Sequence, residues 1–371
     1  MRIWILGDTH FGIYPIRTEK WLSMMTDYFY KECIPFFKKY VKDGDILIQL
    51  GDVYDNRTAI NVKVNNEVVK LFEELSSIFK SGVYVLNGNH DNYNTNYENA
   101  VQSTISIKHI PNIHLISNPT QMTFDNKVCT FLPWIDNENE LKKHLLTYSG
   151  SDILFCHSDL NGCRTQAVPT RRINQELLEL DSFTGYKEVY SGHIHIRQTI
   201  GNFNFVGTPY HLDRNDKGNE KGIHCYDTIK NKTVFIKNNI SPEFISIFIT
   251  KNEDLLKVTN DICNKNYIDL YVNKSLKVAD PTFVTKIDKI LANRKIESIS
   301  WIEEEQINEV KKSPLQNANL DTSWDILDLS KKWVDNLKYT EDKSTNELIK
   351  SGTLDIITKA QSIYIKTKQL L

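Results

Sequence analysis

The sequence predicts a mixed α/β protein, a sandwich of sheets covered by helices, followed by a smaller α/β domain and C-terminal helices. Short apolar runs of strand length alternate with helical periodicity over roughly the first 240 residues. A strand–helix–strand–helix–strand pattern follows up to residue 303. After a polar stretch, apolar residues recur at helical spacing towards the C-terminus.

In the first part, an apolar run at residues 3–6 (IWIL) opens the pattern as a strand. The expected helices span residues 20–41, 62–79 and 138–148, and Pro35 should perturb the first of them. The further expected strands span residues 45–50, 83–86, 113–116, 128–132, 153–156, 188–190, 204–206, 223–226 and 233–236.

The second part should hold strands at residues 244–250, 267–273 and 296–302, and helices at 253–264 and 281–293. Residues 311–322 are polar and irregular, which is typical of a linker. The predicted organisation is therefore a main domain at 1–240, a small domain at 241–310, a linker at 311–322 and a helical segment at 323–371.

Composition narrows the function classes. Forty-five Lys and Arg against 47 Asp and Glu leave a net charge of −2. This balance excludes a broadly basic nucleic-acid coat, so any DNA contact must use local patches or bound metal. No apolar run approaches the roughly 20 residues of a membrane helix, and the six cysteines form no CxxC pair. We expect a cytoplasmic protein without membrane contact.

Histidine and glycine are concentrated in the first part. All ten histidines lie at or before His224, and the last 149 residues contain a single glycine, Gly352. Glycine marks tight turns and histidine marks titration and metal binding. The chemistry should therefore lie in the first 225 or so residues, and the rest should be scaffold or partner surface.

Five short motifs each follow an apolar, strand-like run. They are Gly7-Asp8-Thr9-His10, Gly51-Asp52, Gly88-Asn89-His90-Asp91, His157 and Gly192-His193-Ile194-His195. Because strand C-termini in one sheet converge on one edge, these side chains are expected to form a single cluster. Each motif alone is more often a turn or a structural histidine, and only the five together favour a functional site.

The potential ligands of this cluster are Asp8, His10, Asp52, Asn89, His157, His193 and His195. Carboxylate, imidazole and amide oxygen without thiolate suit manganese, iron or zinc. Seven ligands exceed what one ion accepts, whereas two ions about 3.5–4 Å apart, bridged by one carboxylate, would use them all. Such a pair activates water and holds phosphate oxygens, so the pattern predicts phosphoester hydrolysis.

The series GDTH, GDVYD, GNHD, CHSDLNG, SGHIH and GTPY resembles the calcineurin-like metallophosphoesterases. More closely, it is similar to the SbcD-type nuclease subunits of double-strand-break repair and recombination, including their T-even bacteriophage forms. The resemblance covers residues 1–230 or so. It implies a four-layer αββα sandwich, a capping domain that contacts DNA, and a manganese-dependent DNA exonuclease and single-strand endonuclease; magnesium or another divalent metal could replace manganese.

The resemblance also implies a role for each motif residue. Asp8, His10 and His195 would hold one ion, Asn89, His157 and His193 the other, and Asp52 would bridge the two. His90 would contact the scissile phosphate and assist the leaving oxygen, with Asp91 orienting its imidazole. Cellular relatives often carry histidine three residues after the bridging aspartate, where this chain has Asp55.

DNA and protein partners are the remaining expectations. The residues proposed to contact DNA phosphates are Arg164, Arg171, Arg172, Arg197 and Arg214, each with a solvated surface role as the alternative. The resemblance implies a homodimer and an SbcC-like SMC-type ATPase partner. The partner would dock on the C-terminal helices through Trp324, Leu327, Trp333 and Leu337, unless these pack on the small domain instead.

Two other functions compete with the nuclease. One is a phosphomonoesterase of the same fold, although protein phosphatases usually show GDxxDRG after the bridging aspartate and this chain reads GDVYDNR. The other is a catalytically silent scaffold that binds partners. Such chains typically lose several ligands, and here every expected ligand is present.

Overall fold

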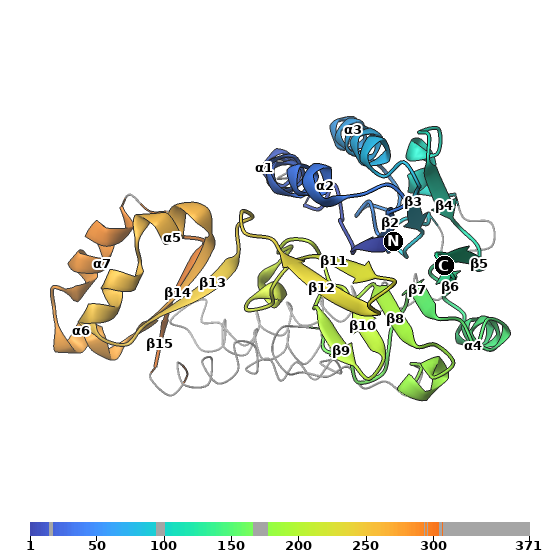
Figure 1. Ribbon diagram of the computed structural model, residues 1–371. Coiled ribbons are helices and arrows are strands. Elements are labelled where there is room, and N and C mark those ends of the chain that lie inside the picture. The colour runs from blue at the N-terminus through green and yellow to red at the C-terminus, as the bar shows by residue number, and fades with distance from the viewer. Residues whose placement is uncertain are drawn as a thin grey trace, which may run out of the picture. The chain divides into compact units, whose positions relative to one another are not determined.

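The computed structural model describes residues 1–14, 18–93, 101–165, 177–292, 294, 296–303 and 306, which belong to one compact unit running from Met1 to Pro314 (Figure 1). The expected linker and the helical segment that carries Trp324, Leu327, Trp333 and Leu337 lie outside the described residues, as do Arg171 and Arg172.

Two six-stranded sheets build the main domain. The first sheet contains β1 (Arg2–Leu6), β2 (Ile46–Gln49), β3 (Val83–Leu86), β4 (Ile113–Ile116), β11 (Gly222–Asp227) and β12 (Lys232–Lys237). Its order is β12-β11-β1-β2-β3-β4, and β1 to β4 run parallel. The carboxyl ends of β1, β2 and β3 therefore lie at one edge.

The second sheet contains β5 (Thr120–Phe124), β6 (Lys127–Leu132), β7 (Ile153–His157), β8 (Glu188–Gly192), β9 (Gln198–Ile200) and β10 (Phe203–Phe205). Its order is β5-β6-β7-β8-β10-β9, and β6, β7 and β8 run parallel. The short strands β5 and β9 had no apolar run long enough to predict them.

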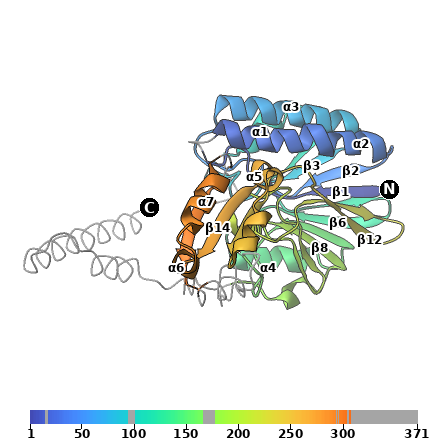
Figure 2. The ribbon, with the colours of Figure 1, turned by 90° about the vertical axis from the view of Figure 1, so that its left-hand side faces the viewer.

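Helices cover the outer faces of both sheets (Figure 2). They are α1 (Thr18–Tyr28), α2 (Ile34–Tyr40) and α3 (Val62–Ile78) on the first sheet and α4 (Glu138–Thr147) on the second. The inner core joins the two sheets through apolar side chains such as Ile5, Ile48, Phe131 and Phe155, all of them buried. The result is a four-layer αββα arrangement, as the sequence predicted.

Local chemistry sets the helix limits. The expected helix at 20–41 is interrupted by a π-helical turn at Phe29–Cys33 immediately before α2. Pro35, the second residue of α2, follows this turn directly and lacks the N–H that would continue the helical hydrogen bonds, which is the perturbation expected at this position. The side chain of Asn61 caps α3 by accepting from the backbone N–H of Lys63 and Val64.

A smaller α/β subdomain, called the cap, spans residues 244–302 within the same compact unit. It contains the parallel strands β13 (Phe244–Ile249), β14 (Tyr267–Asn273) and β15 (Ser298–Ile302), with helices α5 (Asn260–Lys265), α6 (Ser275–Ala279) and α7 (Phe283–Leu291). Its own core includes Ile247, Leu270, Phe283 and Ile287. The single helix expected at 253–264 is instead a 3₁₀ segment, Asn252–Lys257, followed by α5.

Candidate metal centre

The polar side chains at the strand ends meet across the sandwich. From the first sheet come Asp8 and His10 after β1, Asp52 after β2 and Asn89 after β3; from the second come His157 at the end of β7 and His193 and His195 after β8. The expectation of one sheet edge was therefore wrong, because two facing sheets contribute. The expected convergence itself is present.

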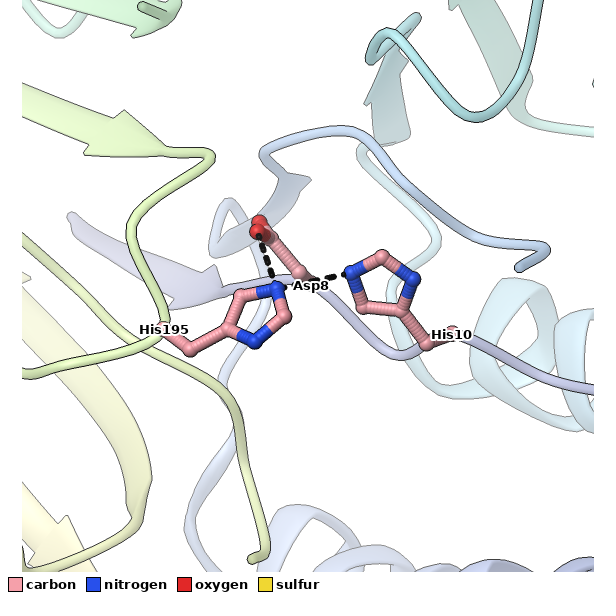
Figure 3. Close-up of side chains that lie close together, drawn as sticks. All are labelled: Asp8, His10 and His195. Carbon is pink, nitrogen blue, oxygen red and sulfur yellow. Dashed lines mark hydrogen bonds and ion pairs between the residues drawn. The ribbon is translucent and has the colours of Figure 1, made fainter. Parts of the chain in front are cut away.

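Asp8, His10 and His195 form the first group (Figure 3). Nε2 of His10 lies 3.0 Å from Nε2 of His195, and Oδ2 of Asp8 lies 4.0 Å from the same His195 nitrogen. One ligand atom from each of the three residues lies within 4.8 Å of the others. That spacing suits three ligands of one cation.

Asn89, His157 and His193 form the second group. Oδ1 of Asn89 lies 3.0 Å from Nε2 of His157 and 2.9 Å from Nδ1 of His193. An amide oxygen and two imidazole nitrogens converge on one point, as a second cation would require.

Asp52 lies between the two groups. Its Oδ2 is 3.6 Å from Nε2 of His10 in the first group and 3.4 Å from Nε2 of His157 in the second. The other oxygen, Oδ1, accepts a hydrogen bond from the backbone N–H of His90 at 2.8 Å. Asp52 is thus oriented by the loop after β3 and is placed to bridge two cations.

Hydrogen bonds fix which nitrogen of each imidazole faces the centre. Nδ1 of His10 donates to Asp55 Oδ1 at 3.1 Å, and Nδ1 of His157 donates to the Leu50 carbonyl at 2.7 Å. In His193 the roles are reversed, because Nε2 faces Oδ2 of Asp159 at 3.3 Å. The inward nitrogens are therefore Nε2, Nε2 and Nδ1, and such outer contacts are typical of metal-binding histidines.

Two further observations test whether these residues fit metal ions. Oδ1 of Asp8 is buried and accepts no hydrogen bond within the described part of the chain, which is costly unless a cation or water satisfies it. A Cβ on Gly88 would collide with Asp52 Oδ1, and one on Gly192 would collide with Asp8 Oδ1. Glycine keeps these carboxylates free to face inwards, so the residues fit a pair of divalent cations.

The backbone is strained at the same place. His10, Asp52 and His193 adopt left-handed conformations with φ of 46°, 53° and 74°, which non-glycine residues rarely occupy. Three proposed ligands share this feature, and such strain is concentrated at functional sites.

Charge interactions shift the pKa values of the buried groups. Burial lowers the pKa of His10 and of His157, but neighbouring carboxylates outweigh it and raise the values to about 8 and about 9. Burial also tends to raise the pKa of Asp52, but His157 and His10 hold that pKa well below its usual range. Burial raises the pKa of Asp8 to about 6.

Metal binding is therefore expected to become tighter as the pH rises from 6 to 9. His10 and His157 hold protons below their raised pKa values, and a cation must displace them. Isothermal titration calorimetry with Mn²⁺ in buffers of different ionisation enthalpy should show proton release that decreases towards pH 9. Affinity and proton release that stay constant over this range would contradict the proposed ligation by these two histidines.

His90 lies beside the two groups. Its ring centroid is 4.8 Å from that of His10, and its Nδ1 donates to the Asp55 carbonyl at 2.6 Å. Its Nε2 is thereby left as the free ring position for a substrate. Burial lowers the pKa of His90.

Asp91 does not have the position expected for it. Its carboxylate accepts backbone N–H groups of Val53, Tyr54 and Gly88 at 3.0–3.2 Å and so ties the loops after β2 and β3 together. The His90 ring instead donates its hydrogen bond to the Asp55 backbone carbonyl. The position of Asp91 directly after His90 in the sequence cannot distinguish these arrangements, because the loop directs the Asp91 side chain inwards.

The carboxylate of Asp55 should matter through His10. Asp55→Asn keeps the shape but removes the charge that stabilises the His10 ring, so Mn²⁺ affinity should fall about 10-fold or more. Calorimetric titration of the variant measures this, with the exposed Asp43→Asn as the matched control. Unchanged affinity in Asp55→Asn would show that the hydrogen bond has no role in metal binding.

Sequence reasoning missed two neighbours of the centre, and it noted Asp55 without predicting its contacts with His10 and His90. Asp159 lies in the CHSD motif and could have been found by its spacing. Trp134, whose ring lies 4.7 Å from that of His193, gave no sequence signal.

Two of the arginines proposed for DNA, Arg197 and Arg214, already have side-chain partners. Arg214 is paired through its guanidinium with Asp269 of the cap, so it is not a free phosphate contact. Arg197 lies 3.2 Å from Glu220 and stacks over Phe235. The backbone of Arg164 exchanges hydrogen bonds with the Gln198 side chain. DNA binding by Arg164 and Arg197 stays a prediction.

Comparison with known proteins gives three findings. A family profile described as calcineurin-like phosphoesterase matches residues 1–197. Exonuclease subunit 1 of Enterobacteria phage T4 is 31% identical over 245 residues, covering 64% of this chain and 68% of that protein. A solved structure of a protein of unknown function from Aquifex aeolicus shows 17% identity over 43% of this chain and 80% of its own, with a TM-score of 0.25.

Within the described residues, no helix has the length and apolar character needed to cross a lipid bilayer.

Proposed function

Because the chain belongs to the calcineurin-like phosphoesterase family, we propose that it is a nuclease subunit that hydrolyses DNA phosphodiester bonds with two divalent cations. One observation carries the proposal: Oδ2 of Asp52 lies 3.6 and 3.4 Å from the inward nitrogens of two separate ligand groups. A single cation site would account for only one of these two ligand groups.

The chain's own residues would prepare the reaction as follows. Asp8, His10, Asp52 and His195 would hold one cation, and Asp52, Asn89, His157 and His193 the other. When bound, the cations would supply positive charge that holds the phosphate and lowers the pKa of an attacking water.

His90 would act on the leaving group of the phosphate. With Nδ1 fixed on the Asp55 carbonyl, protonated His90 can donate from Nε2 to the departing oxygen. The negative charge of a bound phosphate favours the protonated imidazole and offsets the effect of burial on its pKa.

The finer features of the proposal rest on the relative's name. That protein is called an exonuclease subunit, which supports DNA ends as substrate and a second protein as partner. We propose manganese as the metal, an SbcC-like SMC-type ATPase as the partner, a homodimeric assembly, a role in DNA recombination and repair, and the cytoplasm as the place of action. The cap and residues 323–371 would serve DNA and partner binding respectively.

A substrate comparison tests the function. Purified protein with Mn²⁺ should degrade end-labelled linear duplex and nick circular single-stranded DNA, and a candidate ATPase should increase duplex degradation. A chromogenic phosphate monoester incubated in parallel should be turned over slowly. Monoester turnover without DNA cleavage would contradict the nuclease and favour a phosphatase.

A further inference from the structure

One turn connects the cap to the candidate metal centre. Residues 211–221 lie between β10 and β11 and include a short 3₁₀ turn, Arg214–Asp216. The last residue of this segment, Lys221, contacts the backbone of His195, and Lys217 in its middle contacts β14 of the cap.

The contacts that residues 211–221 make near the candidate metal centre are buried and charged. Nζ of Lys221 donates to the His195 carbonyl at 2.6 Å and pairs with Asp216, and these two charged side chains are 4% and 1% exposed. Asp216 also accepts the backbone N–H of Leu212 at 2.7 Å, so its position is fixed within the turn. A buried pair of this kind keeps its geometry because separating it leaves an uncompensated charge.

A second connection lies two residues beyond His195. The Asn219 side chain accepts the Arg197 N–H at 3.0 Å and donates to the Arg197 carbonyl at 3.2 Å. The backbone on both sides of Ile196 is therefore held by the same turn, and that backbone carries the His195 imidazole.

The contacts on the cap side meet at Asp269 in β14, which is 2% exposed. Its carboxylate accepts from Arg214 at 2.8 and 3.1 Å and from Lys217 at 2.7 Å. Lys217 also donates to Ser246 in β13 at 2.9 Å. The positively charged side chains of Arg214 and Lys217 are thus fixed to β14, the central strand of the cap sheet.

His211 adds a second cap contact to the same segment. Its Nδ1 accepts the backbone N–H of Phe244, the first residue of β13, at 3.2 Å, and its Nε2 donates to the Asn219 carbonyl at 3.1 Å. Asn219 is the residue that holds Arg197, so this second chain of hydrogen bonds also ends beside His195.

We propose that Lys221 is a positioning residue for His195 and that Asp269 of the cap is its distant anchor. This inference rests on the proposed metal centre. Metal ligands must lie within about 0.2 Å of their ideal distances, so a shift of the turn would weaken the cation held by Asp8, His10 and His195. The group of Asn89, His157 and His193 has no such link among the described contacts. Displacement of the cap would therefore act on one of the two cations.

Asp269→Asn in the full-length chain tests the link. Calorimetric titration with Mn²⁺ should resolve two sites in the wild type, and the variant should lose about 10-fold or more in affinity at one site while keeping the other. Asp280→Asn is the matched control, because Asp280 pairs with Lys286 inside the cap and its loss weakens the cap without touching the turn. Asp280→Asn should bind Mn²⁺ at both sites with the affinity of the wild type.

Hydrogen exchange gives a readout that needs no metal. In the metal-free protein, backbone amides of residues 195–197 should exchange faster in Asp269→Asn than in the wild type or in Asp280→Asn. Should Asp269→Asn not fold, Arg214→Gln removes one of the two charged partners of Asp269 from a half-exposed position. This variant should show the same changes in affinity and exchange, but smaller ones.

The outcomes separate this inference from the proposed function. Wild-type Mn²⁺ affinity at both sites together with unchanged hydrogen exchange at residues 195–197 in the folded variant would overturn the link. An equal loss of Mn²⁺ affinity at both sites in Asp269→Asn would also contradict the proposed link. If the wild type binds no Mn²⁺, the proposed function fails, and the exchange experiment still decides whether the cap holds His195.

Discussion

Asp52→Asn is expected to lower DNA hydrolysis by about 10³-fold or more and to reduce the bound Mn²⁺ from two ions per chain to one or fewer. The Asp52 carboxylate faces the inward nitrogens of both His10 and His157. An asparagine amide has one oxygen and no charge. It can therefore neither bridge two cations nor offset their positive charge. Plasma emission spectroscopy after dialysis against Mn²⁺ measures the metal content, and initial rates on labelled duplex measure hydrolysis.

The control for this variant is Asp43→Asn, which makes the same chemical change at an exposed position. It should retain both ions and the full rate. Two ions per chain in Asp52→Asn would contradict the bridging role, whatever the activity of the variant.

His90→Asn is expected to lower the hydrolysis rate by about 10²–10⁴-fold while leaving two Mn²⁺ per chain. The His90 ring is held by the Asp55 carbonyl and lies outside both ligand groups, so its loss removes a contact to substrate and no metal bond. The reduction should appear in kcat more than in KM, since the contact strengthens as the leaving oxygen gains charge.

His157→Asn provides the comparison. Its Nε2 faces both Asn89 and Asp52, so this variant should lose one ion per chain along with activity. Equal metal loss in the two variants would contradict the division between ligand and phosphate contact.

The sequence predicted the sheets and the participants of the candidate centre well, because both depend on short-range patterns. Apolar runs located β1, β2, β3, β7 and β8, and the polar residue after each run identified the ligand candidates. Glycine before Asp52, Asn89 and His193 indicated close backbone approach, and the collisions that a Cβ at Gly88 or Gly192 would cause explain that requirement.

What the sequence did not predict depends on three-dimensional direction. It could not show that the ligands come from two facing sheets, since strand order is set by packing between distant elements. Nor could it show that the Asp91 side chain serves backbone N–H groups while Asp55 contacts both His10 and His90. Those directions depend on the backbone conformation of the loops, and a left-handed φ such as that of Asp52 gives no sequence signal at a non-glycine residue.

Arg214 illustrates the same limit for surface charge. Its place after the GTPY motif favoured a phosphate contact, but its guanidinium is paired with an aspartate 55 positions away. Partner choice over that distance depends on how the cap packs, which no local pattern encodes.

Anomalous X-ray diffraction from crystals soaked in Mn²⁺ tests the central claim most directly. Two peaks are expected, one beside Asp8, His10 and His195 and the other beside Asn89, His157 and His193, with the Asp52 carboxylate between them. A single peak, or a peak coordinated by His90, would contradict the two-cation centre.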